Sequence, residues 1–128
     1  MKYYKRNNHR RRRKNRREFN SIPYKLFRKV VSLRDNRECQ VCKYLSGKKT
    51  KGRVSVHHIS AWSVDKENRF NPKNGIVVCF SCHKEMNGKE IEWQSVLLDL
   101  VGKSERAYML EHGISPYIEY LDLDERAD

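Results

Sequence analysis

Four cysteines in two closely spaced pairs are the most specific chemical feature of this sequence. Cys39 and Cys42 form one Cys-x-x-Cys pair, and Cys79 and Cys82 form a second pair after 36 intervening residues. Each pair presents two sulfurs from one tight turn, so two pairs complete the tetrahedral coordination of a zinc ion. The spacing therefore predicts a structural zinc site of four thiolates, in preference to two disulfides of a secreted protein.

Three histidines and one asparagine form a second group with chemical potential. His57 and His58 end a β-branched run, Asn74 precedes a second apolar run, and His83 directly follows Cys82. Taken singly, a histidine on a strand is usually a satisfied or exposed residue, and His83, beside a cysteine pair, could serve as an alternative zinc ligand. Taken together, they favour a hydrolytic site, because neutral imidazoles can ligate a second metal ion or accept a proton from water.

The adjacent histidines raise a geometric question, because neighbouring side chains on a regular strand point to opposite faces. We expect the strand to end and bend at this pair, so that the two imidazoles can face one bound phosphate. Arg53 and Arg69 are the basic residues nearest in sequence that could stabilise the charge of that phosphate.

Hydrophobic spacing predicts the elements that must position these residues. A capping Ser21 and Pro23 in the first turn predict an amphipathic helix, with core positions at Ile22, Leu26, Phe27, Val30 and Val31. Strands are predicted at Val54 to Ile59 and at Ile76 to Val78. The polar segment 60–75 between them contains Asn-Pro and Asn-Gly turn signals, which predict a long loop. A helix is expected to start near Ser81 and to carry His83.

A further helix is predicted after Gly88, with its end at Gly102, and a second short helix that runs to His112 is a candidate after it. Its expected core positions are Ile91, Val96, Leu97, Leu100 and Val101. The tail from Ser115 to Asp128 allows three interpretations: a disordered segment, a partner-binding strand, or an acidic segment that shields the basic N-terminus. His9 and His112 match no pattern and are interpreted as surface residues.

Charge is polarised along the chain, whose formal net charge is +12. Residues 1–17 contain ten Lys or Arg and no acidic residue, whereas residues 111–128 contain six acidic residues and one Arg. Such a basic excess suggests a polyanionic partner, first of all nucleic acid. The sequence has no apolar run of about 20 residues for a membrane span and no apolar segment typical of a secretory signal. We therefore expect a cytoplasmic protein without a membrane partner.

The basic N-terminal arm lacks the apolar residues that a core requires, so we expect it to stay unfolded until it meets phosphates. A solubilising tail is the alternative interpretation, and an arm that binds a membrane surface is a weaker one. The residues that we assign to nucleic-acid binding are Arg10, Arg11, Arg12, Arg13, Lys14, Arg16 and Arg17.

In chain order, "VHHI" at 56–59, "NG" at 74–75 and "CFSCHKE" at 79–85 closely resemble the HNH endonuclease family, in particular its small zinc-knuckle members that occur free-standing in bacteriophages. The resemblance covers roughly residues 37–88. It implies an α+β fold, in which a ββα-metal motif is held by a four-cysteine structural zinc site and flanked by helices. The expected organisation is a disordered basic arm at 1–20, a nuclease domain at 21–102, and a C-terminal helix and acidic tail at 103–128.

The resemblance also implies a role for each residue. His58 would be the general base, and His57 and His83 would ligate the catalytic divalent ion. Asn74 would tether the loop that orients His58. Some family members carry a further histidine where this chain has Asn87, so either the Asn87 oxygen or a water would complete that ligand set.

The function implied is a metal-dependent endonuclease that uses Mg²⁺, Mn²⁺, Ni²⁺ or Zn²⁺ and cuts the P–O3′ bond of DNA. It would nick one strand or cleave both, and RNA is an additional candidate substrate. A monomer offers one site, so a double-strand break requires two visits or a dimer on the DNA. The cell would be a bacterium or a phage-infected host.

Two other classes retain part of the pattern. A zinc-ribbon module that binds nucleic acid without cutting it keeps the arm and the four cysteines but has no need of His58. A secreted nuclease toxin shares the motif, but 128 residues show no import or receptor domain.

Overall fold

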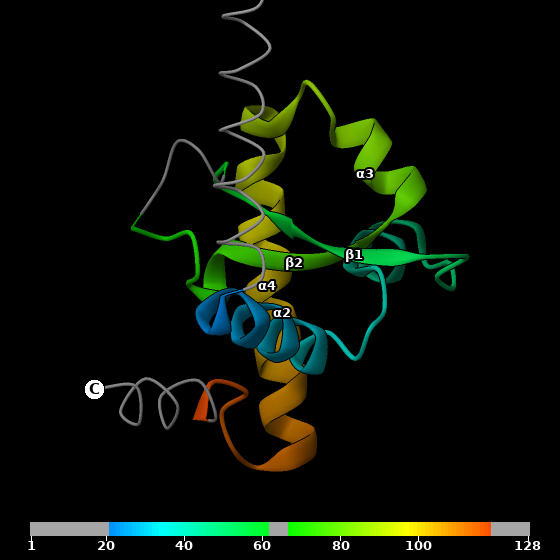
Figure 1. The fold of residues 1–128 in the computed structure, drawn as a ribbon. Helices are drawn as coiled ribbons and strands as arrows, with labels where there is room; N and C mark the ends of the chain where they lie inside the picture. The colour runs from blue at the N-terminus through cyan, green and yellow to red at the C-terminus, as the bar shows by residue number, and fades with distance from the viewer. Residues whose placement is uncertain (1–20, 62–66, 119–128) are drawn as a thin grey trace, which may run out of the picture.

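A computed structural model describes residues 21–61 and 67–118 of the chain (Figure 1). Its central element is an antiparallel hairpin of β1 (Val54–His58) and β2 (Gly75–Cys79), followed directly by helix α3 (Phe80–Met86). The predicted α+β class and the strand-strand-helix order are therefore confirmed. The predicted arm at 1–20 and the end of the acidic tail lie outside the described residues.

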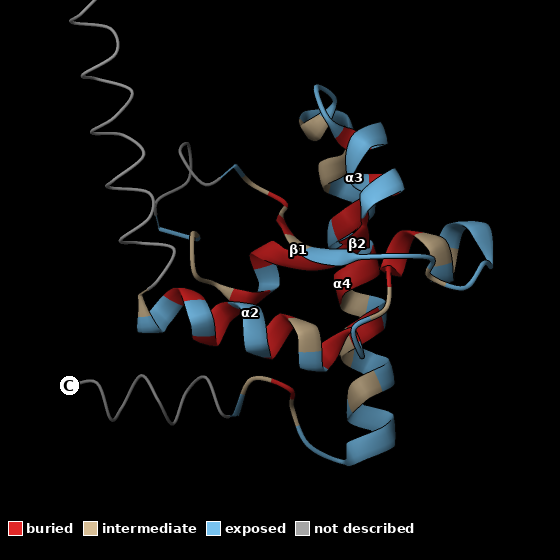
Figure 2. Ribbon diagram, turned by 45° about the vertical axis from the view of Figure 1, so that its right-hand side comes forward, coloured by how far each residue is buried: buried red, intermediate tan, exposed pale blue. Residues whose placement is uncertain are grey.

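Strand pairing is regular along the whole hairpin. His57 pairs with Ile76 and His58 pairs with Gly75, so the ladder continues through the last residue of β1. The bend that we expected at the two histidines is therefore not present. β2 is buried at all five positions, because helices cover it on both faces, whereas the first residues of β1 are exposed. Figure 2 shows the buried positions gathered where the hairpin meets the helices.

Helix α2 (Ile22–Arg34) begins as its sequence predicts, with the Ser21 hydroxyl accepting a hydrogen bond from the Tyr24 N–H. Phe27 and Val31 pack against Val77 of β2 in a small core. Ile22 was predicted to join the apolar face, but its side chain is 73% exposed. It lies in the first turn, before the stripe that contacts the sheet.

Helix α4 (Glu90–His112) is continuous, so the predicted end at Gly102 is wrong. A glycine inside a helix costs only about 1 kcal/mol relative to alanine, and tertiary packing overrides that cost. Here the packing comes from Ser104, two residues later, which is buried against α2. The helix ends at Gly113, whose φ of 72° is the left-handed value typical of a C-terminal cap.

The main core lies between β2, α3 and α4 and includes Leu97, Leu100 and Val101, as predicted. Ile91 and Val96 were also predicted as core residues, but they are 84% and 39% exposed on the outer face of α4. Among the described residues, no helix is both long and apolar enough to cross a membrane.

Candidate active site and metal centres

The four cysteines converge at the junction of the hairpin with two short helical segments. Cys39 follows the turn after α2, Cys42 begins the π-helix η1 (Cys42–Ser46), Cys79 ends β2, and Cys82 lies in α3. Their four sulfur atoms all lie within 4.8 Å of one another. The Cys42 Sγ is 3.8 Å from the Cys79 Sγ and 3.7 Å from the Cys82 Sγ.

These separations fit a metal ion and exclude a disulfide. A zinc ion with four Zn–S bonds of about 2.3 Å in a tetrahedron places its sulfurs about 3.8 Å apart, whereas a disulfide bond is about 2.05 Å long. Burial, followed by the neighbouring thiols, raises the pKa of Cys42 to about 11. The Cys42 thiol therefore resists ionisation unless a cation compensates its charge. Among residues 21–61 and 67–118, this is the one cluster of at least three potential metal-binding His, Cys, Asp or Glu side chains.

His57 faces helix α3 and the imidazole of His83. The two ring centroids lie 5.1 Å apart in an edge-on arrangement. His57 is only 9% exposed, and its Nε2 is the one buried side-chain nitrogen or oxygen of the described residues without a hydrogen-bond partner. A buried polar atom without a partner is costly, so the orphaned nitrogen fits a ligand that binds there.

The charge state of His57 suits a metal ligand. Burial, followed by the neighbouring His83 and His58, lowers the pKa of His57 to about 4. The imidazole is therefore neutral at pH 7, and an unprotonated nitrogen is what a divalent ion requires. His83 itself is exposed on α3, so the pair has one buried and one open member.

Asn87 and Glu90 lie beyond the C-terminal end of α3, on the same side of the hairpin as this pair. Asn87 caps α3, and its backbone N–H donates to the His83 carbonyl. Glu90, the first residue of α4, interacts electrostatically with both His57 and His83, and its Oε1 accepts from the Gly88 N–H at 3.0 Å. The sequence analysis missed Glu90, although a carboxylate seven residues after His83 is a visible signal.

His58 faces the other side of the hairpin, toward α2. Its ring stacks on Phe27 at 4.7 Å between centroids and lies 6.2 Å from the Tyr24 ring, nearly parallel to it. Its Nε2 is 2.8 Å from the Arg69 carbonyl oxygen. A carbonyl can only accept, so Nε2 carries the proton and Nδ1 is the basic nitrogen. Burial lowers the pKa of His58, which favours the neutral ring.

Asn74 ties together the ends of the loop between the two strands. Its Oδ1 accepts from the Ser60 N–H at 2.7 Å, and its Nδ2 donates to the carbonyls of Ser60 and Asn68. Its own carbonyl accepts from the Ile59 N–H at 2.8 Å. Both residues that follow His58 are therefore hydrogen-bonded to Asn74.

Basic side chains line a hollow of about 390 Å³ on the outer face of α2. The hollow is formed by Lys25, Arg28, Lys29, Ser32, Leu33 and Arg37. Cations at this spacing provide a surface that suits nucleic-acid phosphates. The arm residues Arg10 to Arg17, which we predicted to bind nucleic acid, lie outside the described part of the chain.

A family model matches the part of the chain that contains the cysteine cluster and the candidate site residues. Residues 39–89 match the family model described as HNH endonuclease. The matched segment contains the four cysteines and all of the candidate residues from His57 to Asn87. This segment of the chain is therefore similar to the HNH endonuclease family.

Among solved structures, the chain is similar to the HNH endonuclease of the deep-sea thermophilic bacteriophage GVE2, crystallised with a manganese ion. The two share 26% sequence identity with a TM-score of 0.55, over 69% of this chain and 94% of the phage protein. No curated protein sequence matches the chain.

Proposed function

We propose that this protein is a metal-dependent endonuclease that hydrolyses phosphodiester bonds of DNA. The observation that carries the proposal is the buried His57, whose Nε2 has no hydrogen-bond partner and whose ring lies beside that of His83, inside the segment matched to the HNH family. A buried polar atom without a hydrogen bond is found mainly at functional sites, because a bound ligand offsets the desolvation penalty of that atom. A catalytic divalent ion is the ligand that imidazole nitrogens bind.

His57 and His83 would hold that ion, with Asn87 or a water as a further ligand. When bound, the ion would polarise a phosphoryl oxygen and neutralise charge on the leaving 3′ oxygen. Imidazole suits Ni²⁺ and Zn²⁺ better than Mg²⁺, which prefers oxygen ligands. Mn²⁺ is the first ion to test, since the similar phage enzyme was crystallised with manganese.

His58 would act as the general base, through Nδ1. The Arg69 carbonyl fixes the proton on Nε2, and stacking on Phe27 fixes the ring plane. A neutral Nδ1 can accept the proton of an attacking water, a contribution of typically 10²- to 10⁴-fold in general-base catalysis. Attack at phosphorus with departure of the 3′ oxygen leaves a 5′-phosphate and a 3′-hydroxyl.

The four cysteines would hold a structural zinc ion that is separate from the catalytic one. The cysteine cluster joins the turn after α2 to the end of β2 and to α3. β2 pairs with β1, which carries His57, and α3 carries His83. A closed site of four thiolates leaves no position for substrate. Its contribution is therefore to folding and to the placement of α3 beside β1.

DNA phosphates would contact the basic arm and the basic hollow on α2. These contacts are independent of sequence, so the affinity should fall steeply with added salt. RNA offers the same phosphates and is a second candidate substrate. The protein would nick DNA as a monomer, and cleavage of both strands would require two visits or a dimer on the DNA.

The test is a plasmid-nicking assay with the purified zinc-loaded protein and Mg²⁺, Mn²⁺ or Ni²⁺. We expect the wild type to convert supercoiled plasmid to the open circle, His83→Ala to lose this activity, and His112→Ala to keep it. A wild-type protein that binds the plasmid but leaves it intact with every ion would contradict the proposal and favour the non-cutting zinc-ribbon module. Sequencing the cut ends then gives strand number, end chemistry and site preference.

A further inference from the structure

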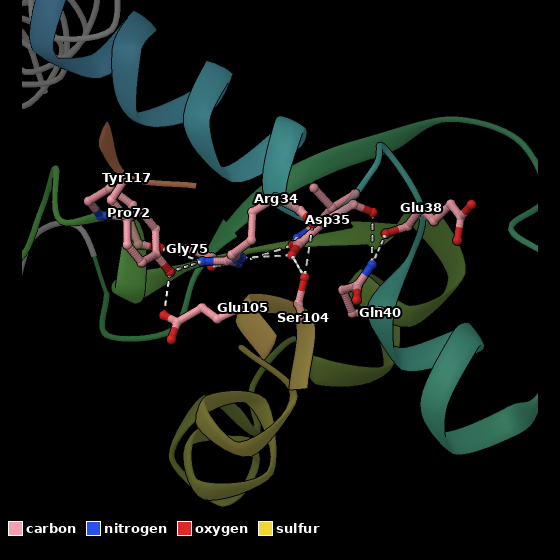
Figure 3. Close-up of polar contacts among 10 residues, drawn as sticks. Arg34, Asp35, Glu38, Gln40, Pro72, Gly75, Ser104, Glu105 and Tyr117 are labelled. Carbon is pink, nitrogen blue, oxygen red and sulfur yellow. Dashed lines mark hydrogen bonds and ion pairs between the residues drawn. The ribbon is translucent and has the colours of Figure 1, made fainter. Parts of the chain in front are cut away.

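Arg34, the last residue of α2, lies outside the segment matched to the HNH family, yet it reaches the loop that carries Asn74. Its side chain is fully buried, and Figure 3 shows it at the centre of a polar network. Nε and Nη2 donate to the two carboxylate oxygens of Asp35, at 2.8 and 3.1 Å. The remaining donors reach the carbonyls of Pro72 and Gly75 and the hydroxyl of Tyr117. All five N–H groups of the guanidinium are thereby used.

The two carbonyls bound by Arg34 lie on either side of Asn74. Nη1 donates to the Pro72 oxygen at 2.9 Å, and Nη2 donates to the Gly75 oxygen at 2.6 Å. Both residues are buried, where a carbonyl without a donor is costly. The Pro72 oxygen also accepts from the Gly75 N–H, so Arg34 adds a second donor to an existing turn. The Arg34 guanidinium therefore fixes the backbone on both sides of Asn74, the residue that bonds to Ile59 and Ser60.

Asp35 anchors the cation from the opposite side. One carboxylate oxygen accepts from the Val77 N–H of β2 at 2.8 Å, and the other accepts from the Ser104 hydroxyl of α4 at 2.5 Å. Arg34 is thus oriented by the sheet and by α4 as well as by its own helix. A fully bonded guanidinium in such a site has little freedom to turn.

The outer edge of Arg34 contacts the C-terminal part of the described chain. Nη1 donates to the Tyr117 hydroxyl at 3.1 Å, and that hydroxyl in turn donates to the carboxylate of Glu105 on α4. The segment after α4 is thereby connected through one side chain to the loop at Asn74. Nothing in the spacing of Arg34 and Tyr117, 83 residues apart, indicates this connection.

We propose that Arg34 is a positioning residue for the active-site loop, and that Tyr117 and Glu105 hold Arg34 in its working orientation. Arg34 acts through Asn74, which bonds to the two residues that follow the candidate base His58. The inference rests on the proposed nuclease function for its kinetic consequence, but its structural consequence is independent of any activity.

Two substitutions in the full zinc-loaded chain test this role. Tyr117→Phe removes only the hydroxyl, and Tyr108→Phe on α4 is its matched control. We expect Tyr117→Phe to lower kcat for plasmid nicking about fivefold, with KM and the unfolding temperature close to wild type. Arg34→Lys keeps the charge beside Asp35 but has three donors in place of five, so we expect a drop in kcat of roughly tenfold or more.

Amide hydrogen exchange gives a second measurement that requires no activity. In Tyr117→Phe the amides of Ile59 and Ser60, both bonded to Asn74, should exchange about fivefold faster. The amide of Lys43, bonded to the Cys39 carbonyl at the zinc site, should be unchanged. Equal exchange in wild type and Tyr117→Phe, or a uniform rise at all amides, overturns the positioning role. If the wild type cuts no DNA, the proposed nuclease function is wrong, but the exchange measurement still tests the positioning role of Arg34.

Discussion

His57 and His58 are adjacent in the sequence, yet their rings lie on opposite faces of the β1–β2 hairpin. His57 faces His83 on α3, whereas His58 stacks on Phe27 of α2. The regular strand pairing through both residues enforces this separation, because consecutive side chains on a strand alternate. His58 is also the last residue of β1. A substrate phosphate that uses both imidazoles must therefore lie across the end of the strand, next to the loop that Asn74 holds.

His58→Phe separates the chemical role of this ring from its packing role. Phenylalanine preserves an aromatic ring against Phe27 but cannot accept a proton. We expect nicking to fall about 10²-fold or more, while the DNA affinity measured by fluorescence anisotropy stays within a factor of two. The control is His112→Phe, which should retain activity. A His58→Phe protein that cuts at the wild-type rate would exclude His58 as the base.

His57→Leu should abolish binding of the catalytic ion and raise the free energy of unfolding. In the absence of the catalytic ion, the wild type buries an unpartnered imidazole nitrogen, and an apolar side chain of similar size removes that penalty. We expect the free energy of unfolding of the zinc-loaded protein to rise by about 1 kcal/mol. Mn²⁺ binding at the histidine site, followed by electron paramagnetic resonance, should be lost. If urea denaturation shows no gain in stability for His57→Leu, the His57 Nε2 has a hydrogen-bond partner in solution.

Substitutions at Asn87 and Glu90 test how many protein groups surround the catalytic divalent ion. Asn87→Ala should weaken Mn²⁺ binding if the amide oxygen is a ligand, and should leave it unchanged if water takes that place. Glu90→Gln removes the negative charge that interacts with both histidines, so we expect weaker binding of Mn²⁺. Glu92→Gln, in the same first turn of α4, is the matched control. Titration calorimetry of the three variants measures each effect.

The sequence predicted the local elements well because the information for them is local. The cysteine pairs, the cap at Ser21 and the apolar run of β2 each depend on neighbouring residues. The errors arose where distant contacts decide: Gly102 stays helical because Ser104 packs on α2, and the histidine pair does not bend because β2 continues the ladder. In the sequence, Arg34 and Asp35 are typical of the polar end of a helix. They are at the centre of the buried network only because of their partners on β2 and α4.

Removal of the cysteine cluster should unfold the domain. Cys79→Ser weakens a thiolate set whose metal affinity is part of the folding free energy, about 10 to 16 kcal/mol of apparent binding energy in zinc-finger peptides. We expect the far-ultraviolet circular dichroism of the variant to lose its cooperative thermal transition, and a strong chelator to do the same to the wild type. A variant that retains the wild-type transition would mean that the four thiols pack as an apolar core without a metal ion.

Gly75→Ala and Gly102→Ala should shift stability in opposite directions. A Cβ at Gly75 would lie 2.5 Å from the Phe27 ring and 2.9 Å from a methyl group of Val31, so the aromatic ring on which His58 stacks must move. We expect a loss of about 1 to 3 kcal/mol from overpacking, together with reduced nicking. At Gly102, inside α4, the nearest atom is the flexible end of Arg106 at 3.4 Å, and alanine should add about 0.5 to 1 kcal/mol through helix propensity. Urea denaturation measures both shifts. Equal effects at the two sites would contradict the close packing of α2 against the start of β2.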